Sequence, residues 1–511
     1  MNIRMKKIWR IGVIVICLII LSIFAIKSYQ AEKDTYMGIK RIRIEDIVTF
    51  GEESFEDISG FITYDGERAA IDVKTKTIYA SVNIEKDSSI RDVHNKINIL
   101  NSEYDLYFVE DNHMNNLYEA IQNNYVFKII AAHKEGYYIC YNLVFTTLPI
   151  LSMGGTYSYT NEDNREVMYG DFLLWTPFDS DVEKHTLKKS HVEWNVRGRT
   201  LVNAPKKSWK ISLKKSEGKN NKLALLGMGE DDDWILNPLY KDDTKVREKL
   251  FMDLWNGMAE KATYNKKMST GEYVEVVING EYQGLYLLQR RIDRKYLNLS
   301  DKDVLFKAGK TYLPQSVEEA YEIEYSLLTT PDTYALLDGI YMTKDCSQIV
   351  LDNFVDITLF MNLGATFDNV GYINVYYVFE YLDDGNYDIT YILWDTDMSF
   401  GTQWIEEFEY NFDATKDALL ERQENGSMQV LHPELEEFLT KRWKELRKTE
   451  LCEQNILSYV ECLEQQIENS GAIERDRNLW GSYNGEEDTL NNLKRFITYR
   501  LNFLDKNYCV N

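Results

Sequence analysis

The stretch that most constrains this chain is Tyr391-Ile-Leu-Trp-Asp-Thr-Asp-Met-Ser-Phe-Gly401, an apolar run that ends in two acids and a glycine. Side chains alternate along a strand, so Asp395 and Asp397 are expected to share a face and to hold one hard cation between them. A further acid, Asp368, stands upstream in Asp368-Asn-Val-Gly-Tyr-Ile-Asn374. One acid that handles a proton and another that binds magnesium are what phosphoryl transfer requires. Taken singly, each motif is also typical of acids that cap turns.

Composition limits the class of protein. The chain has 511 residues, 44% of them hydrophobic, which is enough for two or three packed domains. Its formal net charge of −24 repels nucleic acid and anionic lipid and favours encounter with basic partners. After Cys17 the sequence holds five more cysteines without C-x-x-C spacing, which indicates neither a zinc site nor a disulfide framework.

The N-terminus predicts an uncleaved signal anchor over residues 1–30. Four basic residues precede Ile11–Ile26, sixteen residues without a charge, and Lys27 follows. Such a run is short for a membrane span and slightly long for a secretory signal, but either interpretation exports the rest of the chain. Because positive residues stay inside, we expect the body to lie outside the cytoplasm, or to be secreted if the segment is cleaved.

The rest of the chain divides into three parts. Residues 31–150 alternate in short runs that predict a β-rich module, and 151–415 mix strands and helices. In this second part we expect helices over Asp242–Ala259 and Asp352–Leu363 and a type I′ hairpin at Asn279-Gly280. Residues 416–511 are predicted to be helical, with apolar stripes that serve as packing faces. The fold class is therefore α+β.

Seven motifs follow one another along the α+β part: Arg197-Gly198; Pro205-Lys-Lys-Ser-Trp-Lys-Ile-Ser-Leu213; Leu225-Leu-Gly-Met228 before Asp233-Trp-Ile-Leu-Asn237; Lys245-Val-Arg-Glu-Lys-Leu250; Ile278-Asn-Gly-Glu-Tyr-Gln-Gly-Leu-Tyr286; Asp368; and Trp394-Asp-Thr-Asp-Met-Ser-Phe-Gly401. Their order resembles the spore coat protein H (CotH) kinase family. The resemblance covers about half of the chain, from near residue 150 to near residue 410.

The resemblance implies an atypical, minimal protein-kinase-like body that transfers the terminal phosphate of ATP to serine or threonine of a protein, with magnesium. It implies that Asp368 is the catalytic acid next to the substrate hydroxyl. Asp395 would bind the metal, with Asp397 and Asn374 beside it. Phosphate would be contacted by Lys207 or Lys210, and Arg197 adds positive charge. Lys206 and Arg199 complete a basic cluster, which is also typical of a strand edge protected by lysines.

Departures from kinase patterns leave alternatives open. The chain has no Gly-rich loop, His-Arg-Asp, Asp-Phe-Gly or phosphate-loop motif, so an ordinary kinase or P-loop enzyme is not supported. Family members commonly have Asn at Arg199 and Glu at Arg290. The second of these differences favours a pseudokinase that acts as a cell-surface or spore-coat scaffold. A carbohydrate hydrolase that uses paired acids and aromatic platforms is a third possibility.

Overall fold

The structure is a computed structural model. It describes residues 40–84, 90, 93, 95–110, 114, 116–161, 165–177, 187–198, 202–309, 316–343, 347–366, 369, 374–403, 409–410, 414, 435–486 and 488–508. Two compact units make up the chain, Met1–Thr147 and Leu148–Asn511. Within the described ranges, no helix is both long and apolar enough to cross a membrane. The predicted anchor over 1–30 lies outside them.

Strands dominate the described part of the first unit. One sheet has the order β1-β8-β9-β10-β6-β5, with β2 paired to β10, and a smaller sheet has the order β4-β3-β7. Alternation explains the strand β8, whose residues Tyr104, Leu106 and Phe108 are buried. The elements are β1 (Lys40–Arg43), η1 (Ile44–Phe50), β2 (Glu52–Glu53), η2 (Ser59–Phe61), β3 (Ile62–Tyr64), β4 (Glu67–Arg68), β5 (Ala70–Asp72), β6 (Thr77–Ser81), β7 (Ile97–Ile99), β8 (Tyr104–Glu110), α3 (Leu117–Gln122), β9 (Phe127–His133) and β10 (Tyr137–Thr146).

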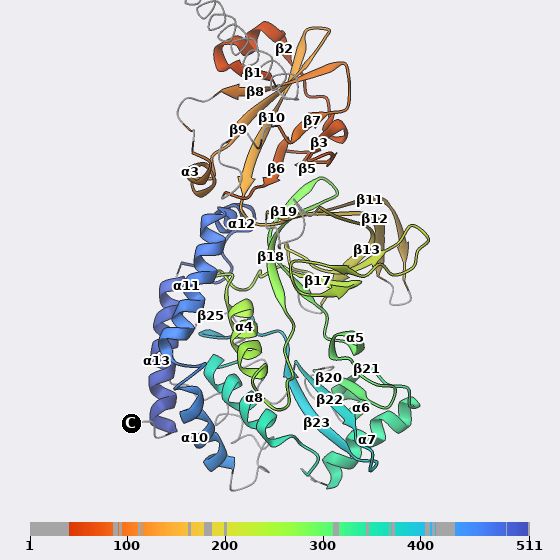
Figure 1. The fold of residues 1–511 in the computed structure, drawn as a ribbon, viewed down its shortest axis with the longest axis vertical. Coiled ribbons are helices and arrows are strands. Elements are labelled where there is room, and N and C mark those ends of the chain that lie inside the picture. Colours follow the sequence, from red (N-terminus) through yellow and green to blue (C-terminus); the bar gives the residue numbers. More distant parts are fainter. Residues whose placement is uncertain are drawn as a thin grey trace, which may run out of the picture. The chain divides into compact units, whose positions relative to one another are not determined.

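A closed barrel begins the second unit, with the strand order β11-β12-β13-β14-β17-β19-β18 (Figure 1). It closes because β11 pairs with β18 in parallel, so each of these strands has a partner on both sides. The predicted hairpin is confirmed: Asn279 (φ 50°) and Gly280 (φ 76°) make the turn between β18 and β19. The strands are β11 (Ile150–Thr160), β12 (Glu166–Trp175), β13 (Lys188–Arg197), β14 (Ser208–Lys214), β17 (Asp233–Asn237), β18 (Gly271–Ile278) and β19 (Glu281–Arg290).

Side chains of alternate strand positions fill the barrel. Val192 and Trp194 of β13 and Ile211 and Leu213 of β14 point into its buried core. Residues that alternate with them along the strands, such as Lys210 and Ser212 of β14, face outward. The outer face continues into the main hydrophobic core of the unit, to which Ile235 and Leu287 contribute.

Below the barrel in Figure 1 lies an antiparallel sheet with the order β21-β20-β22-β23. Its strands are β20 (Val304–Ala308), β21 (Tyr321–Tyr325), β22 (Val375–Tyr381) and β23 (Tyr387–Leu393). Helix α8 (Leu351–Gly364) contacts β23 and is almost wholly buried, as expected for the predicted helix over 352–363. The remaining short elements are β15 (Leu223–Ala224), β16 (Glu230–Asp231), α5 (Arg294–Leu297), α6 (Val317–Ala320), α7 (Thr330–Thr343), β24 (Thr402–Gln403) and β25 (Glu409–Tyr410).

Helix α4 (Arg247–Ala259) begins five residues later than predicted. The Asp242 carboxylate accepts hydrogen bonds from the backbone N–H groups of Thr244 (3.0 Å) and Arg247 (2.8 Å). This local bonding holds residues 242–246 in a turn, in which Lys245 has φ 62°. Because backbone with positive φ cannot be part of a right-handed helix, the helix starts only after this turn.

The described residues of the predicted helical part, 435–486 and 488–508, form α10 (Leu435–Leu446), α11 (Glu453–Asn469), α12 (Ala472–Trp480) and α13 (Leu490–Asn507). In the α13 stripe, Leu493, Ile497, Leu501 and Leu504 are buried. Helix α11 contacts α4, α12 and α13, and α13 contacts α8 (Figure 1). The tail helices therefore belong to the same core as the sheet and the outer face of the barrel, and the α+β class is confirmed.

Candidate functional site

The acid motif after β23 does not continue the strand. Pairing between β22 and β23 ends at Val375 and Leu393, and Asp395 has φ 61°. The expectation that Asp395 and Asp397 share one strand face is therefore wrong. Aspartate tolerates this left-handed backbone better than most residues. Both carboxylates therefore belong to an irregular loop that follows β23 and not to the strand itself. Asp395 is half-buried and Asp397 is buried.

Two cations lie beside Asp395. Arg197 ends β13 on the barrel, and its Cζ lies 5.7 Å from the centroid of the Trp394 ring. Lys307 comes from β20, and its Nζ lies 5.6 Å from the same ring. Two parts of the fold that are far apart in sequence thus bring positive charges to the residue that precedes Asp395.

The electrostatics of this group follow from burial. Burial lowers the pKa of Arg197, whereas the Asp395 carboxylate opposes the shift. Burial and the charge of Arg197 lower the pKa of Lys307, and Asp395 again opposes. Cations held away from water interact strongly with anionic oxygens. The arrangement is suited to binding a phosphate chain next to Asp395.

A second charged pair adjoins these cations. The Arg291 guanidinium lies 2.8 Å from the Glu324 carboxylate of β21. Burial and Glu324 raise the pKa of Tyr376, while the charges of Arg197 and Arg291 act in the opposite direction. The Arg291–Glu324 pair therefore lies within electrostatic range of the same tyrosine as Arg197.

The lysines predicted to contact phosphate, Lys207 and Lys210, lie just before and on β14. Lys207 donates to the Val202 carbonyl (2.8 Å), so its ammonium group bonds to the loop before β14. Lys210 is half-buried on the outer face of β14. Against the effect of burial, hydrogen bonds from Ser212 and Lys295 lower the pKa of Asp233, and the charge of Lys210 adds a smaller contribution. Lys206 is fully buried and lies 2.5 Å from Asp476 of α12. Among the members of the basic cluster that the structure describes, Arg197 lies near Asp395.

The segment around Asp368 is described only in part. Asp368 and Arg199 lie outside the described residues. Asn374 has φ 53°, and its backbone carbonyl accepts from the Trp394 N–H (2.9 Å) and the Asn369 side-chain amide (3.3 Å). Asn369 also donates to the Trp394 carbonyl (2.8 Å). Among the described residues, the buried Oδ1 of Asn369 has no hydrogen-bond partner.

Glu248, in the first turn of α4, is a further carboxylate at this loop. It is 1% exposed. Its Oε2 accepts from both the backbone N–H (2.7 Å) and the hydroxyl (2.9 Å) of Thr396. Burial, followed by the charges of Asp397 and Asp395, raises the pKa of Glu248 to about 8. Three carboxylates thus lie close enough to repel one another.

The oxygen donors near this loop are of the type that magnesium prefers. The described residues contain no three His, Cys, Asp or Glu side chains in a ready-made metal arrangement. They do provide the carboxylates of Asp395 and Asp397 and the unpartnered amide oxygen of Asn369, which are the oxygen ligands that hard cations prefer. A cation would also relieve the repulsion that raises the pKa of Glu248.

Sequence reasoning missed Lys307, Glu248 and the Arg291–Glu324 pair. Lys307 carries a weak signal, because it is a lone charge within the apolar strand Val304-Leu-Phe-Lys-Ala308. Glu248 belongs to the motif Lys245–Leu250, but an acid in the first turn of a helix is also typical of an ordinary solvated side chain. Nothing in the sequence pairs Arg291 with Glu324.

Comparison with known proteins gives one family. A sequence model of the family described as CotH kinase protein matches residues 195–504, from β13 to α13. Because the match covers more than half of the chain, this protein belongs to the CotH kinase protein family, which indicates a kinase-like function. Among curated proteins, none matches the chain.

Proposed function

We propose that this protein transfers the terminal phosphate of ATP to serine or threonine of a protein substrate and requires magnesium. One observation carries the proposal: Asp395 lies beside the cations Arg197 and Lys307, in a chain whose formal net charge is −24. Membership of the CotH kinase protein family supports a kinase-like activity. Phosphoryl transfer depends mainly on positioning and charge neutralisation, which such a group can supply.

The residues take distinct roles in this proposal. Arg197 and Lys307 bind oxygens of the triphosphate, and the half-buried Asp395 faces them. Asp395, Asp397 and the Asn369 amide oxygen would hold Mg²⁺. When bound, Mg²⁺ neutralises phosphate charge and orients the phosphates. Asp368 accepts the proton of the substrate hydroxyl.

Location and substrate class form a second part of the proposal. The basic N-terminus and the uncharged run Ile11–Ile26 support a single-pass anchor with the body outside the cytoplasm. The acidic composition supports a Lys/Arg-rich, Ser-containing protein substrate, because opposite charges accelerate encounter. Nucleic acid is not a partner in this scheme.

The test is transfer of label from γ-labelled ATP to a basic Ser-rich peptide. We expect Mg²⁺-dependent transfer that is lost in Asp395→Asn and on chelation, and kept in Asp388→Asn. Asp388 is a matched control because it is an exposed acid on β23, the strand that leads to the motif. Equal transfer by the Asp395→Asn variant would refute the proposal. An acidic peptide labelled equally fast at low and high salt would refute the substrate class alone.

The alternative hypothesis of a pseudokinase scaffold depends on Arg290, which stands where family members commonly have Glu. In the structure Arg290 donates to the Met228 carbonyl (3.1 Å) and lies 2.7 Å from Asp231, with its Cζ 4.9 Å from the centroid of the Tyr296 ring. These contacts tie β19 to the segment before β17. The arginine thus has a structural role of its own, and its presence is not an argument against nucleotide binding. Failure of the unaltered protein to bind nucleotide with Mg²⁺ would favour the scaffold.

A further inference from the structure

The Glu248 side chain attaches the loop that carries Asp395 and Asp397 to α4. Thr396 stands between the two acids, and both its backbone N–H and its hydroxyl donate to the same oxygen of Glu248, at 2.7 and 2.9 Å. Thr396 is fully buried and Glu248 is 1% exposed. Since β23 has ended at Leu393, no strand pairing holds this amide. A backbone N–H that is buried away from water needs a hydrogen-bond partner, and Glu248 supplies it.

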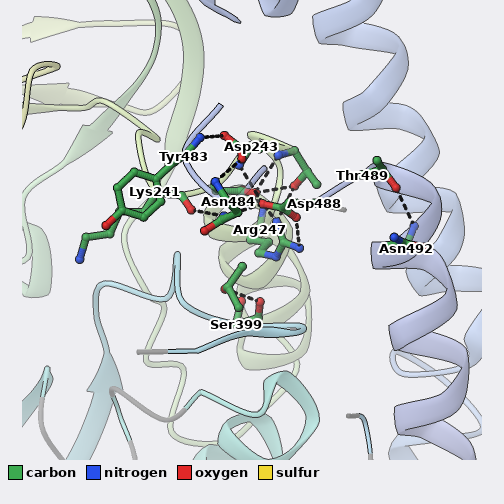
Figure 2. A network of polar contacts seen from close by, with 12 residues as sticks. Lys241, Asp243, Arg247, Ser399, Tyr483, Asn484, Asp488, Thr489 and Asn492 are labelled. Atoms are coloured by element: carbon green, nitrogen blue, oxygen red, sulfur yellow. Dashed lines mark hydrogen bonds and ion pairs between the residues drawn. The ribbon is translucent and has the colours of Figure 1, made fainter. Parts of the chain in front are cut away.

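The start of α4 is itself fixed firmly. Arg247, the residue before Glu248, lies 2.7 Å from Asp488, which precedes α13. The Asp243 carboxylate accepts from the backbone N–H groups of Tyr483 (2.8 Å) and Asn484 (2.6 Å). Figure 2 shows these contacts converging from the loop before α13 on the start of α4. Glu248 therefore projects from a rigid base, and a rigid base is what a positioning residue needs.

We propose that Glu248 is a positioning residue that clamps Thr396 and so sets the spacing of Asp395 and Asp397 for the metal. This rests on the proposed function. Groups that orient the ligands of a metal commonly change its affinity by about 10-fold to 100-fold when they are removed. Here the clamp acts through both bonds, because the N–H and the hydroxyl held by one oxygen fix the peptide planes at residue 396 and its side chain together.

The experiment uses the full chain and Mn²⁺ as the metal probe, with a nonhydrolysable ATP analogue. Thr396→Val keeps the shape of the side chain and removes the hydroxyl bond, whereas Thr396→Ser retains that bond. Thr358→Val is the matched control, because the Thr358 hydroxyl is buried and bonds to Phe354 O within α8. We expect Thr396→Val to weaken Mn²⁺ binding about 10-fold. Thr396→Ser and Thr358→Val should stay within about 2-fold of the unaltered protein, a change below the weakest effect expected from loss of an orienting group.

Hydrogen exchange gives a readout that needs no metal. In Glu248→Ala the amide of Thr396 should exchange faster than in the unaltered protein, and in Thr358→Val it should not change. Unchanged exchange in Glu248→Ala, or unaltered Mn²⁺ affinity in Thr396→Val, would overturn the clamp while leaving the proposed function intact. If the unaltered protein bound no Mn²⁺ with the nucleotide, the proposed function would fail, and with it the role of the clamp at a metal.

Discussion

Replacing Asp476 with asparagine should strongly destabilise the second unit. The carboxylate is fully buried on α12 and lies 2.5 Å from Lys206 and 3.2 Å from Lys245, and it accepts from the Leu285 N–H at 2.9 Å. Asparagine keeps the shape but leaves two buried ammonium groups without a counter-charge. Breaking a buried ion pair in this way costs about 3–5 kcal/mol, out of a total stability of about 5–15 kcal/mol for a typical domain.

Urea unfolding followed by tryptophan fluorescence measures this loss. Nine of the ten tryptophans follow residue 148, so the signal reports the second unit. With an m value of about 3 kcal/mol/M, the midpoint should fall by roughly 1 M or more. Asp301→Asn is the control, because Asp301 is 73% exposed in its pair with Arg294 and such pairs contribute at most about 1 kcal/mol. Equal midpoints for the two variants would refute the reasoning.

Three further outcomes are expected. Lys307→Met should weaken binding of an ATP analogue about 10-fold or more, as loss of a charged hydrogen bond implies, whereas Lys207→Met should leave the titration nearly unchanged. Gly284→Ala should unfold at a lower urea concentration than Gly385→Ala. Both glycines have positive φ, but a Cβ at Gly284 would collide with the buried carboxylate of Asp476 on α12, whereas a Cβ at Gly385 would meet no atom within 4 Å. In metal-free protein, folding raises the pKa of Glu248 to about 8, so the folded state keeps the carboxyl proton up to about that pH. The unfolded chain loses this proton near the ordinary pKa of glutamate. Stability relative to Glu248→Gln should therefore fall as pH rises through that window, and unfolding at pH 5 and pH 8 checks the sign.

Local signals predicted much of the fold. Asn279-Gly280 specified its hairpin because the turn needs positive φ at both residues, and the stripe of α13 specified a buried face. The barrel could not be predicted in this way, since its closure depends on the parallel pairing of β11 with β18, more than a hundred residues apart.

The candidate site divides along the same line. The sequence pointed to the motif that contains Asp395, but it did not predict how the two carboxylates lie. The prediction relied on strand alternation, and the left-handed backbone at Asp395 ends that alternation. Lys307 and Glu248 reach the motif only through packing of β20 and α4. Lys206 belonged to a basic run, yet burial against Asp476 gives it a structural role.

Helix α13 has a consequence for how the protein is made. Its Arg500 donates to the Asn362 carbonyl at the end of α8 (2.8 Å). The ring of Phe496, also on α13, lies 3.1 Å from the position that a Cβ at Gly401 would take. Helix α13 therefore supports the acid motif from a later part of the chain. Because α13 follows the motif in the sequence, the newly made motif stays unsupported until this helix has also been synthesised and has packed against α8.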